Sequence, residues 1–257
     1  MIVGFIGSGN MAAAMARGWA SSERDAPSKM LFTDSGSGRA SALAEEVGGE
    51  AVQGNAELVR ASDFVVLAMK PNGLDAVAES LPVPRAILSL LGATKVSRLT
   101  ELFPDSTVLR LMPNLGVEAG RGVIAVADPE NTDREIVADA FTLLGSLGSV
   151  VELPDEQMDA ATAVMGCSPA YFAVVADALA RAGVAEGLDP EVSLHMVAES
   201  LAGTAELLKR RTPFEIQVAV ASPGGSTEAG LKGLKEARGA QAFEAAAEAS
   251  LARMRGA

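Results

Sequence analysis

The stretch IVGFIGSGNMAAAM, Ile2 to Met15, decides the fold of the first part of this chain. A short apolar run, typical of a buried strand, leads into two glycines, and an Ala- and Met-rich segment typical of a helix comes directly after. The motif is G-x-G-x-x-A. Gly7 permits a tight turn, Gly9 lets the backbone approach a pyrophosphate, and Ala12 lets the helix pack closely on the strand. We therefore predict the start of a Rossmann domain, with the helix N-terminus facing dinucleotide phosphates.

The same alternation of strand and helix continues outward from this motif. Apolar runs at residues 29–34, 50–54, 63–71, 86–91, 106–114 and 122–127 predict further strands, with helical segments between several of them. This order predicts an α/β fold with a doubly wound parallel sheet, and the continuous apolar strands fit a sheet covered on both faces. Helical periodicity replaces the strand signal near Leu153. We predict a dinucleotide-binding Rossmann domain over 1–152 and an all-helical domain for dimerisation and substrate binding over 153–257.

Local signals place several helices of the second half. Asp189 and Thr212 each precede a proline and predict helix starts, and Glu215 would complete a capping box with Thr212. Gly183 and Gly187 are predicted to end the helix before Asp189.

The most apolar stretch of the chain runs from Ala160 to Ala176 and is interrupted by Pro169. We interpret it as a buried helix, and we expect no membrane association. The segment from Ala170 to Ala185 is apolar on more than one face, which a small bundle cannot bury alone, so a partner subunit is expected.

Composition narrows the class of protein. The chain has 257 residues, 49% of them hydrophobic, and a formal net charge of −12, which argues against nucleic acid as a partner. The single cysteine, Cys167, cannot form a disulfide within the chain, and the first residues predict a strand instead of a signal peptide, so we expect a cytoplasmic protein. Cys167 is interpreted as a buried thiol and His195, the only histidine, as a helix-surface residue. No metal-ligand spacing is present, and no metal is predicted.

The residues at the ends of the predicted strands are candidates for cofactor binding. Asp34, at the end of the second strand, is placed to bind a ribose 2′-hydroxyl and slightly favours NADH. Ser35, Ser37 and Arg39 come next and would instead suit the 2′-phosphate of NADPH, so both cofactors stay open. The cofactor contacts predicted from these patterns are Gly7, Ser8, Gly9, Asn10, Met11, Asp34, Ser35, Met69, Lys70 and Pro71.

The most distinctive string, VASPGGSTEAGLKGL, spans Val220 to Leu234. Its Pro-Gly-Gly must form a tight turn, and Ser226 and Thr227 are predicted to cap the next helix. An ordinary capping loop would explain the residue types but not the whole string.

With this string, the sequence resembles the pyrroline-5-carboxylate reductase family. The matching blocks are G-F-I-G-x-G-N-M at Gly4–Met11, K-P at Lys70–Pro71, M-P-N at Met112–Asn114, G-S-[GS]-P-A-Y at Gly166–Tyr171 and S-P-G-G-[TA]-T at Ser222–Thr227.

The resemblance implies an enzyme that reduces the cyclic imine 1-pyrroline-5-carboxylate to proline with NADPH or NADH. It also implies a Rossmann domain followed by a helical domain that interlocks in a homodimer, and rings of such dimers in some members. The implied substrate contacts are Ser222, Gly224, Gly225, Ser226 and Thr227, with backbone N–H groups holding the carboxylate. Thr227 would hydrogen-bond the imine nitrogen and Ser222 would add a hydroxyl, which makes these two the catalytic candidates. Asn114 joins the cofactor contacts through the M-P-N block.

The chain departs from the family pattern at three places. Leu115-Gly116-Val117 replaces T-P-A, Gly92-Ala93-Thr94 replaces A-A-G, and Cys167 replaces serine. These changes leave two alternatives: a related reductase acting on another imine or ketone, and a non-catalytic homologue that binds the dinucleotide. The sequence leaves two roles for Tyr171, as an active-site residue or as part of the packed core.

Overall fold

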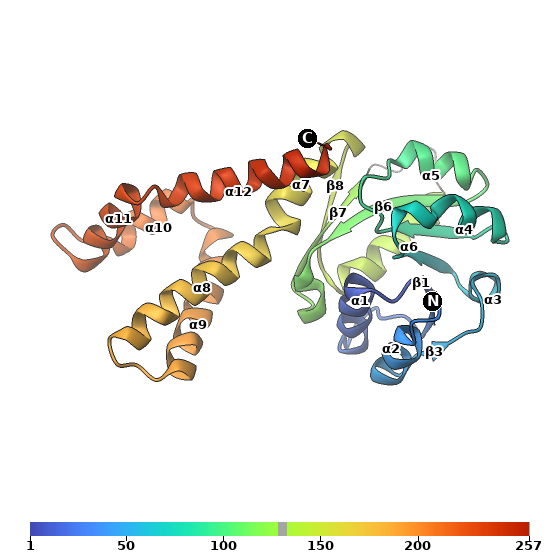
Figure 1. The fold of residues 1–257 in the computed structure, drawn as a ribbon, viewed down its shortest axis with the longest axis horizontal. Coiled ribbons are helices and arrows are strands. Elements are labelled where there is room, and N and C mark those ends of the chain that lie inside the picture. The colour runs from blue at the N-terminus through green and yellow to red at the C-terminus, as the bar shows by residue number, and fades with distance from the viewer. Residues whose placement is uncertain (128–132, 257) are drawn as a thin grey trace. The chain divides into compact units, whose positions relative to one another are not determined.

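The computed structural model describes residues 1–127 and 133–256 and is drawn in Figure 1. Strands and helices alternate through the first part of the chain. The strands are β1 (Ile2–Ile6), β2 (Lys29–Thr33), β3 (Glu50–Ala51), β4 (Phe64–Leu67), β5 (Ala86–Ser89), β6 (Thr107–Pro113), β7 (Gly122–Ala127) and β8 (Gly148–Leu153). The helices among them are α1 (Asn10–Ala20), α2 (Arg39–Val47), α3 (Asn55–Ala61), α4 (Leu74–Ser80), α5 (Val96–Leu102) and α6 (Arg134–Gly145), with 3₁₀ turns at Pro71–Gly73 and Leu115–Ala119.

The strands form one eight-stranded sheet in the order β3-β2-β1-β4-β5-β6-β7-β8. Every pairing is parallel except β6 with β7, where Met112 faces Ala125. The order reverses direction between β1 and β4, and in such sheets ligands bind outside the carboxyl ends of the strands at that point. The Rossmann prediction is confirmed. The edge strand β8 was not among the predicted strands, because its GSVVEL sequence lacks the continuous apolar run of the inner strands, and its residues are exposed or half-buried.

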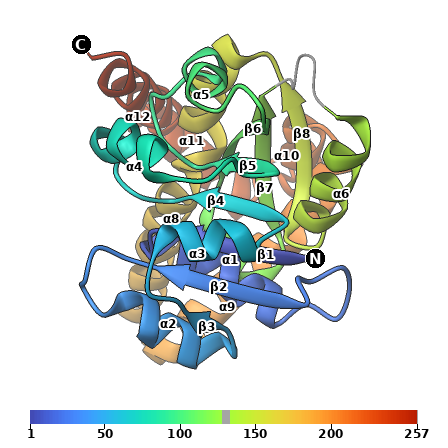
Figure 2. The ribbon, with the colours of Figure 1, turned by 90° about the vertical axis from the view of Figure 1, so that its right-hand side faces the viewer.

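Helices lie on both faces of the sheet (Figures 1 and 2). An apolar cluster fills the space between helices and strands on each face, and this is the physical basis of the doubly wound fold. On one face Val3 and Phe5 pack with Trp19 of α1, and on the other Ile6 and Leu67 pack with helices α3 to α5. Each face therefore buries its own strand side chains, as the continuous apolar runs predicted.

A second set of helices comes after the sheet. These are a 3₁₀ turn (Asp155–Gln157), α7 (Met158–Ala161), a π-helical turn (Thr162–Gly166), α8 (Ser168–Ala185), α9 (Pro190–Leu208), α10 (Pro213–Val220), α11 (Ser226–Glu236) and α12 (Gly239–Met254). No strand occurs in the described residues after Leu153. The predicted caps at Asp189 and Thr212 are confirmed, the second as a complete capping box with Glu215.

Other local predictions need correction. Gly183 lies inside α8 and does not end it. Glycine is needed there because α9 packs closely on this point of α8: a Cβ on residue 183 would lie only 2.3 Å from Ser193 Oγ. Gly187, with φ +95°, lies just past the helix end as predicted. Ser226 and Thr227 are the first residues of α11, whose N-cap is Gly225.

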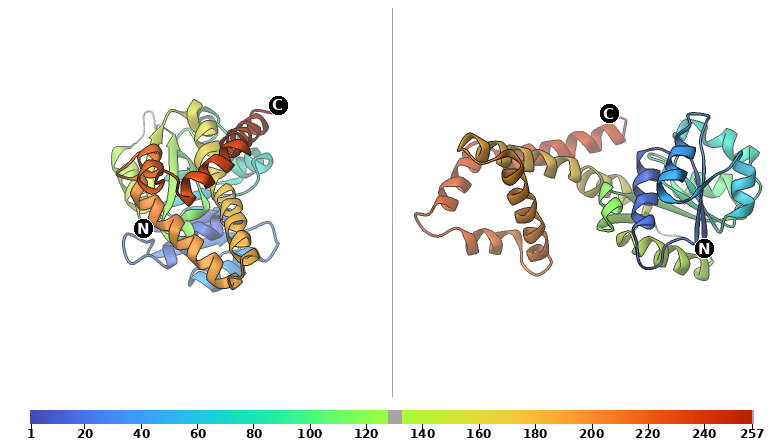
Figure 3. Two further views of the ribbon diagram at one scale, coloured as in Figure 1. Left: turned by 90° about the vertical axis from the view of Figure 1, so that its left-hand side faces the viewer. Right: turned by 90° about the horizontal axis from the view of Figure 1, so that it is seen from below.

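The chain divides into two compact units, 1–166 with 251–257, and 167–250. The division falls after the predicted boundary at residue 152, because α7 packs on β7 and the π-helical turn packs on β6. In the second unit α8 and α9 form a hairpin, which Figure 3 shows from two further sides. Within this hairpin Ser193 Oγ donates to Ala180 O over 2.9 Å. Among the described residues of this unit only Ala180 and Ser193 are buried, so it has almost no core of its own.

The segment Asp155–Ala185 is long and apolar enough to cross a membrane, by length and composition alone. Only 11% of its most apolar window is buried, so this chain does not supply the burial that was predicted for Ala160–Ala176. The reason is that little of the chain packs over α8 besides α9. The other contact comes from α12, where the Tyr171 hydroxyl lies 2.6 Å from Ser250 Oγ and donates to Ala246 O over 3.3 Å.

Candidate active site

The turn between β1 and α1 has the conformation that the glycine motif requires. Gly7 has φ +99°, and a Cβ there would lie 2.8 Å from the carbonyl carbon and oxygen of Ala68, so only glycine fits. Gly9 is different, because a Cβ there would meet the protein only at Ala68 O, 3.9 Å away. The space beside Gly9 is therefore open, as it must be if a ligand approaches the backbone.

Helix α1 begins at this turn without any side-chain cap. Gly9 is its N-cap, no side chain accepts from the first N–H groups, and no acidic residue lies in the first turn. These free N–H groups and the helix dipole attract an anion. The helix N-terminus thus fits a dinucleotide pyrophosphate.

A pocket of about 580 Å³ lies at the reversal point of the sheet. Of the predicted cofactor residues, it is lined by Gly7, Ser8, Gly9, Asp34, Ser35, Met69 and Lys70. Asn10, Met11, Pro71 and Asn114 are not among the residues that line it, and their contacts remain predictions. Ser37 and Arg39, which the sequence offered as contacts of a 2′-phosphate, also line it. The lining residues that were not predicted are Ile6, Thr33, Asn55, Ala68, Asn72, Gly73 and Val77. The sequence signal for Asn55 was its place as the first residue of a helix after Gly54. In the structure its Oδ1 accepts from Thr33 Oγ1 over 2.7 Å. The size and the lining fit a nicotinamide dinucleotide.

The Asp34 carboxylate lies half-buried at the end of β2 and is fully hydrogen-bonded within its own loop. Oδ1 accepts from the N–H groups of Gly36 (2.7 Å) and Ser37 (3.0 Å), and Oδ2 accepts from Ser37 Oγ (2.9 Å) and Ala40 N (2.8 Å). These bonds, first of all that from Ala40, hold the pKa of Asp34 below its ordinary value.

Asn114 lies at the end of β6, buried, with its side chain engaged on three sides. Its Oδ1 accepts from Gly116 N (3.2 Å) and Val123 N (3.1 Å), and its Nδ2 donates to Met165 O (3.1 Å). In a regular helix Met165 O would accept from the N–H of residue 169, which is a proline and has none. Asn114 therefore shapes the Leu115–Ala119 turn and supports the π-helical turn.

The family departure at Gly116 also has a structural reason. A Cβ there would lie 3.0 Å from Arg121 O and 3.1 Å from Asn114 Oδ1, which is tight. Leu115 beside it is 54% exposed.

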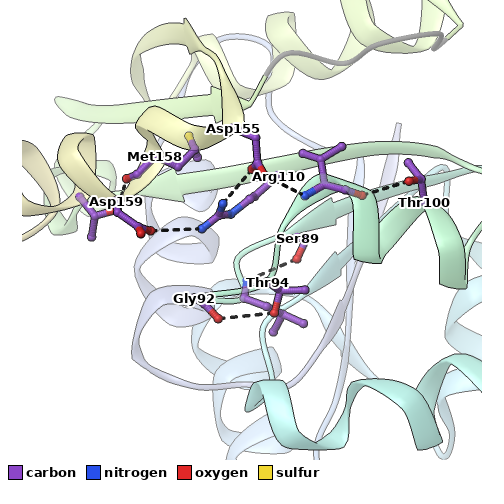
Figure 4. A network of polar contacts seen from close by, with 11 residues as sticks. Ser89, Gly92, Thr94, Thr100, Arg110, Asp155, Met158 and Asp159 are labelled. Atoms are coloured by element: carbon purple, nitrogen blue, oxygen red, sulfur yellow. Dashed lines mark hydrogen bonds and ion pairs between the residues drawn. The ribbon is translucent and has the colours of Figure 1, made fainter. Parts of the chain in front are cut away.

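A buried arginine joins β6 to the segment after β8, as Figure 4 shows. Arg110 has a side chain only 3% exposed, and its Nη1 lies 2.7 Å from Asp155 Oδ1, with Asp159 Oδ1 3.8 Å from Nη2. Asp155 Oδ2 accepts from Val96 N, at the start of α5, over 3.3 Å. Arg110 was not predicted, because an arginine inside an apolar strand has no local signal for its partners. This network fixes α7 to the sheet beside the loop after β5.

The S-P-G-G-S-T loop belongs to the second unit and forms the predicted tight turn. Gly225 N donates to Ser222 O over 2.9 Å, and Gly224 has φ +73°. Gly224 N donates to Glu228 Oε2 over 2.8 Å, whereas no side chain caps α11. The loop thus leaves the first N–H groups of α11, from Ser226 onward, without a side-chain partner.

Two other residues considered from the sequence lie away from any such arrangement. His195 is exposed on α9, and Cys167 is half-buried before α8. Within residues 1–127 and 133–256, no three His, Cys, Asp or Glu side chains gather as metal ligands would.

Comparison with known proteins adds family evidence to this geometry. Residues 155–257 match the family model for pyrroline-5-carboxylate reductase dimerisation, and residues 2–91 match that for NADP oxidoreductase, coenzyme F420-dependent. The chain is 33% identical to the pyrroline-5-carboxylate reductase of Synechocystis sp. over 91% of this chain and 90% of the relative. It is 37% identical to that of Thermus thermophilus over 75% and 74%.

Solved structures agree with these sequence relatives. The 1-pyrroline-5-carboxylate reductase of Streptococcus pyogenes superposes with a TM-score of 0.88 at 27% identity, covering 100% of this chain and 99% of that one. A Plasmodium falciparum pyrroline carboxylate reductase with NADP bound shares the fold, with a TM-score of 0.85 at 24% identity over 100% and 97%.

Proposed function

Because the chain belongs to the pyrroline-5-carboxylate reductase family, we propose that it reduces 1-pyrroline-5-carboxylate to proline with NADPH or NADH. The observation that carries this proposal is that two of the helix N-termini without a side-chain cap, those of α1 and α11, each adjoin a feature suited to an anionic ligand. That of α1 adjoins a pocket of about 580 Å³ suited to a dinucleotide, and that of α11 comes after the S-P-G-G-S-T turn. In this scheme residues 1–152 bind the cofactor, and residues 153–257 bind the substrate and a second subunit.

The chain's residues hold and orient the substrate. The N–H groups of Ser226 and Thr227 hold its carboxylate, because Gly224 N is already engaged by Glu228. The Thr227 hydroxyl hydrogen-bonds the imine nitrogen, as donor to the neutral imine or as acceptor from the protonated one, and Ser222 adds a hydroxyl to the carboxylate site. A threonine is a weak acid, so orientation of a substrate that arrives protonated is its larger role. When bound, the reduced nicotinamide supplies the hydride to the imine carbon. The C=N bond then becomes the C–N bond of proline.

A second subunit would cover the apolar side chains that the helical unit leaves exposed. Phe172, Val174 and Phe214 are more than half exposed in the single chain, as are several other large apolar side chains of α8 to α11. A second copy that interlocks here would bury them, which a stable homodimer requires. The same burial accounts for the apolar Asp155–Ala185 segment without a membrane, and we propose a cytoplasmic enzyme. Light scattering after size exclusion distinguishes a dimer from a ring of dimers, and flotation with vesicles tests for membrane binding.

A coupled absorbance assay tests the activity directly. Purified protein receives 1-pyrroline-5-carboxylate with NADPH and then with NADH, and oxidation of the nicotinamide is followed. Turnover, with proline identified as the product, is expected. Protein that binds the cofactor but reduces neither this imine nor a panel of other imines and ketones would be the non-catalytic homologue. Turnover confined to another compound would identify the related reductase that the Leu115-Gly116 departure leaves open.

A substitution then tests the site assignment. Thr227→Ala should lower kcat roughly 10- to 100-fold through lost orientation of the imine, with the Kd of the cofactor unchanged. Thr142→Ala, at an exposed position of α6, is the matched control and should leave both constants unchanged. A Thr227→Ala variant with full kcat would remove Thr227 from the catalytic residues.

A further inference from the structure

The hydrogen bonds of Asp34 leave its carboxylate no capacity for a cofactor. An ionised carboxylate offers about four lone-pair sites, and Asp34 accepts four hydrogen bonds from Gly36, Ser37 and Ala40. An acid that selects NADH must accept from the ribose hydroxyls. Asp34 could do so only by giving up bonds that hold its own loop.

The same four bonds fix the conformation of the segment between β2 and α2. Ala40 N is one of the N–H groups at the start of α2 that lack a helical partner, and Asp34 Oδ2 satisfies it. Gly36 and Gly38 both have positive φ, so the segment bends sharply around the carboxylate. Asp34 is therefore the internal brace of this turn.

The braced segment presents polar and basic groups to the pocket. Ser35, Ser37 and Arg39 all line it and are exposed. Of all the residues that line this pocket, the cations are Arg39 and Lys70 and the one acid is Asp34. A guanidinium with neighbouring hydroxyls is a phosphate-binding combination.

We infer that Asp34 is a positioning residue that builds an NADPH-selective loop, in which Arg39, Ser35 and Ser37 receive the 2′-phosphate. This inference rests on the proposed function only in taking a nicotinamide dinucleotide as the cofactor. It selects the second of the two cofactors that the sequence left open, against the slight preference for NADH that the position of Asp34 gave. Removal of an acid that excluded a 2′-phosphate would tighten NADPH binding, whereas removal of this brace loosens it.

Calorimetric titration without substrate tests the inference. The probes are adenosine 2′,5′-diphosphate and adenosine 5′-monophosphate, which differ by the 2′-phosphate, and then NADPH and NADH. The wild-type protein should bind each 2′-phosphorylated probe roughly 10- to 100-fold more tightly than its partner, as expected for charge-assisted hydrogen bonds. Equal affinity within each pair, or tighter binding of NADH, would overturn the inference.

Two variants separate contact from positioning. Arg39→Ala should remove most of the preference for the 2′-phosphate, whereas Arg60→Ala, an exposed arginine of α3 outside the pocket, should keep it. Asp34→Ala should weaken the 2′-phosphorylated probes about 10-fold and leave adenosine 5′-monophosphate and NADH within about twofold, which general unfolding would not do.

The isosteric Asp34→Asn keeps the test decisive if Asp34→Ala does not fold. Its oxygen can still accept from Gly36 and Ser37, but its NH₂ cannot accept from Ala40, so an intermediate loss is expected. Tighter NADPH binding in either Asp34 variant would show that Asp34 excludes the phosphate and would overturn the inference. Because only binding is measured, absence of imine reduction would count against the proposed function and not against this loop.

Discussion

The buried ion pair between Arg110 and Asp155 offers a sharp test of how the sheet holds the segment after β8. In Asp155→Ala, Arg110 keeps its charge in a site where its side chain is 3% exposed, with only the Asp159 carboxylate 3.8 Å away. Removal of one partner of a buried pair costs about 3–5 kcal/mol, because the remaining charge is uncompensated. Asp155 itself is 23% exposed and Asp159 partly compensates, so we expect the lower end, about 3 kcal/mol.

A second substitution distinguishes an uncompensated charge from lost packing. Arg110→Met in the Asp155→Ala background removes the stranded charge and fills the site with an apolar chain of similar length. Replacement of a buried pair by apolar residues is often neutral. The double variant should therefore be more stable than Asp155→Ala alone, by about 1–2 kcal/mol.

Equilibrium urea unfolding at one fixed protein concentration measures these differences. Trp19 is the only tryptophan, is 1% exposed and donates from Nε1 to Leu143 O, so its fluorescence reports the sheet unit. With a urea m-value of about 2–3 kcal/mol/M, a loss of about 3 kcal/mol lowers the midpoint by about 1–1.5 M. The control is Asp75→Ala, which breaks the exposed Arg98–Asp75 pair and should cost under about 1 kcal/mol.

Two outcomes would refute the reasoning about Arg110. In one, Asp155→Ala lowers the midpoint no further than Asp75→Ala does. In the other, the double variant is less stable than Asp155→Ala, which would mean that the Arg110 side chain stabilises the fold through its packing even without the Asp155 carboxylate.

The glycine turn, Asn114 and Asp34 can each be tested further. Gly7→Ala forces a side chain into a positive-φ position and should cost about 1–3 kcal/mol and abolish cofactor binding in titration, whereas Gly145→Ala, in open space, should do neither. Asn114→Ala removes the acceptor of two N–H groups, those of Gly116 and Val123, and one donor to Met165 O, and a calorimetric Tm several degrees below wild type is expected; an unchanged Tm would contradict the bracing role. The lowered pKa of Asp34 means that its contribution to stability is complete above its unfolded pKa of about 3.9 and is lost as pH falls through the lower folded value. Selectivity for the 2′-phosphate should thus be constant in titrations from about pH 9 to 7, where the phosphate also keeps its full charge because its second pKa is about 6, and a loss in that range would count against the brace.

Local sequence determined the elements whose signals lie within a few neighbouring residues. The apolar run ending at Gly7 fixes a strand and a turn, since no other residue fits its φ of +99°. Asp189 and Thr212 start helices through hydrogen bonds to N–H groups two and three residues away, so their role is visible in the string itself. The S-P-G-G-S-T string likewise determined its own turn.

Tertiary structure alone decided what depends on partners distant in the sequence. Arg110 meets Asp155, and Asn114 meets Met165, only because the chain returns to β6 after β8. The segment Gly148–Leu153 forms the edge strand β8 because it pairs with β7. Asp34 is a different case, because its four donors lie within its own loop, only two to six residues along the chain, and yet the sequence pattern pointed to a ribose contact. A carboxylate binds whichever donors the folded chain brings closest, and a sequence pattern does not rank those donors.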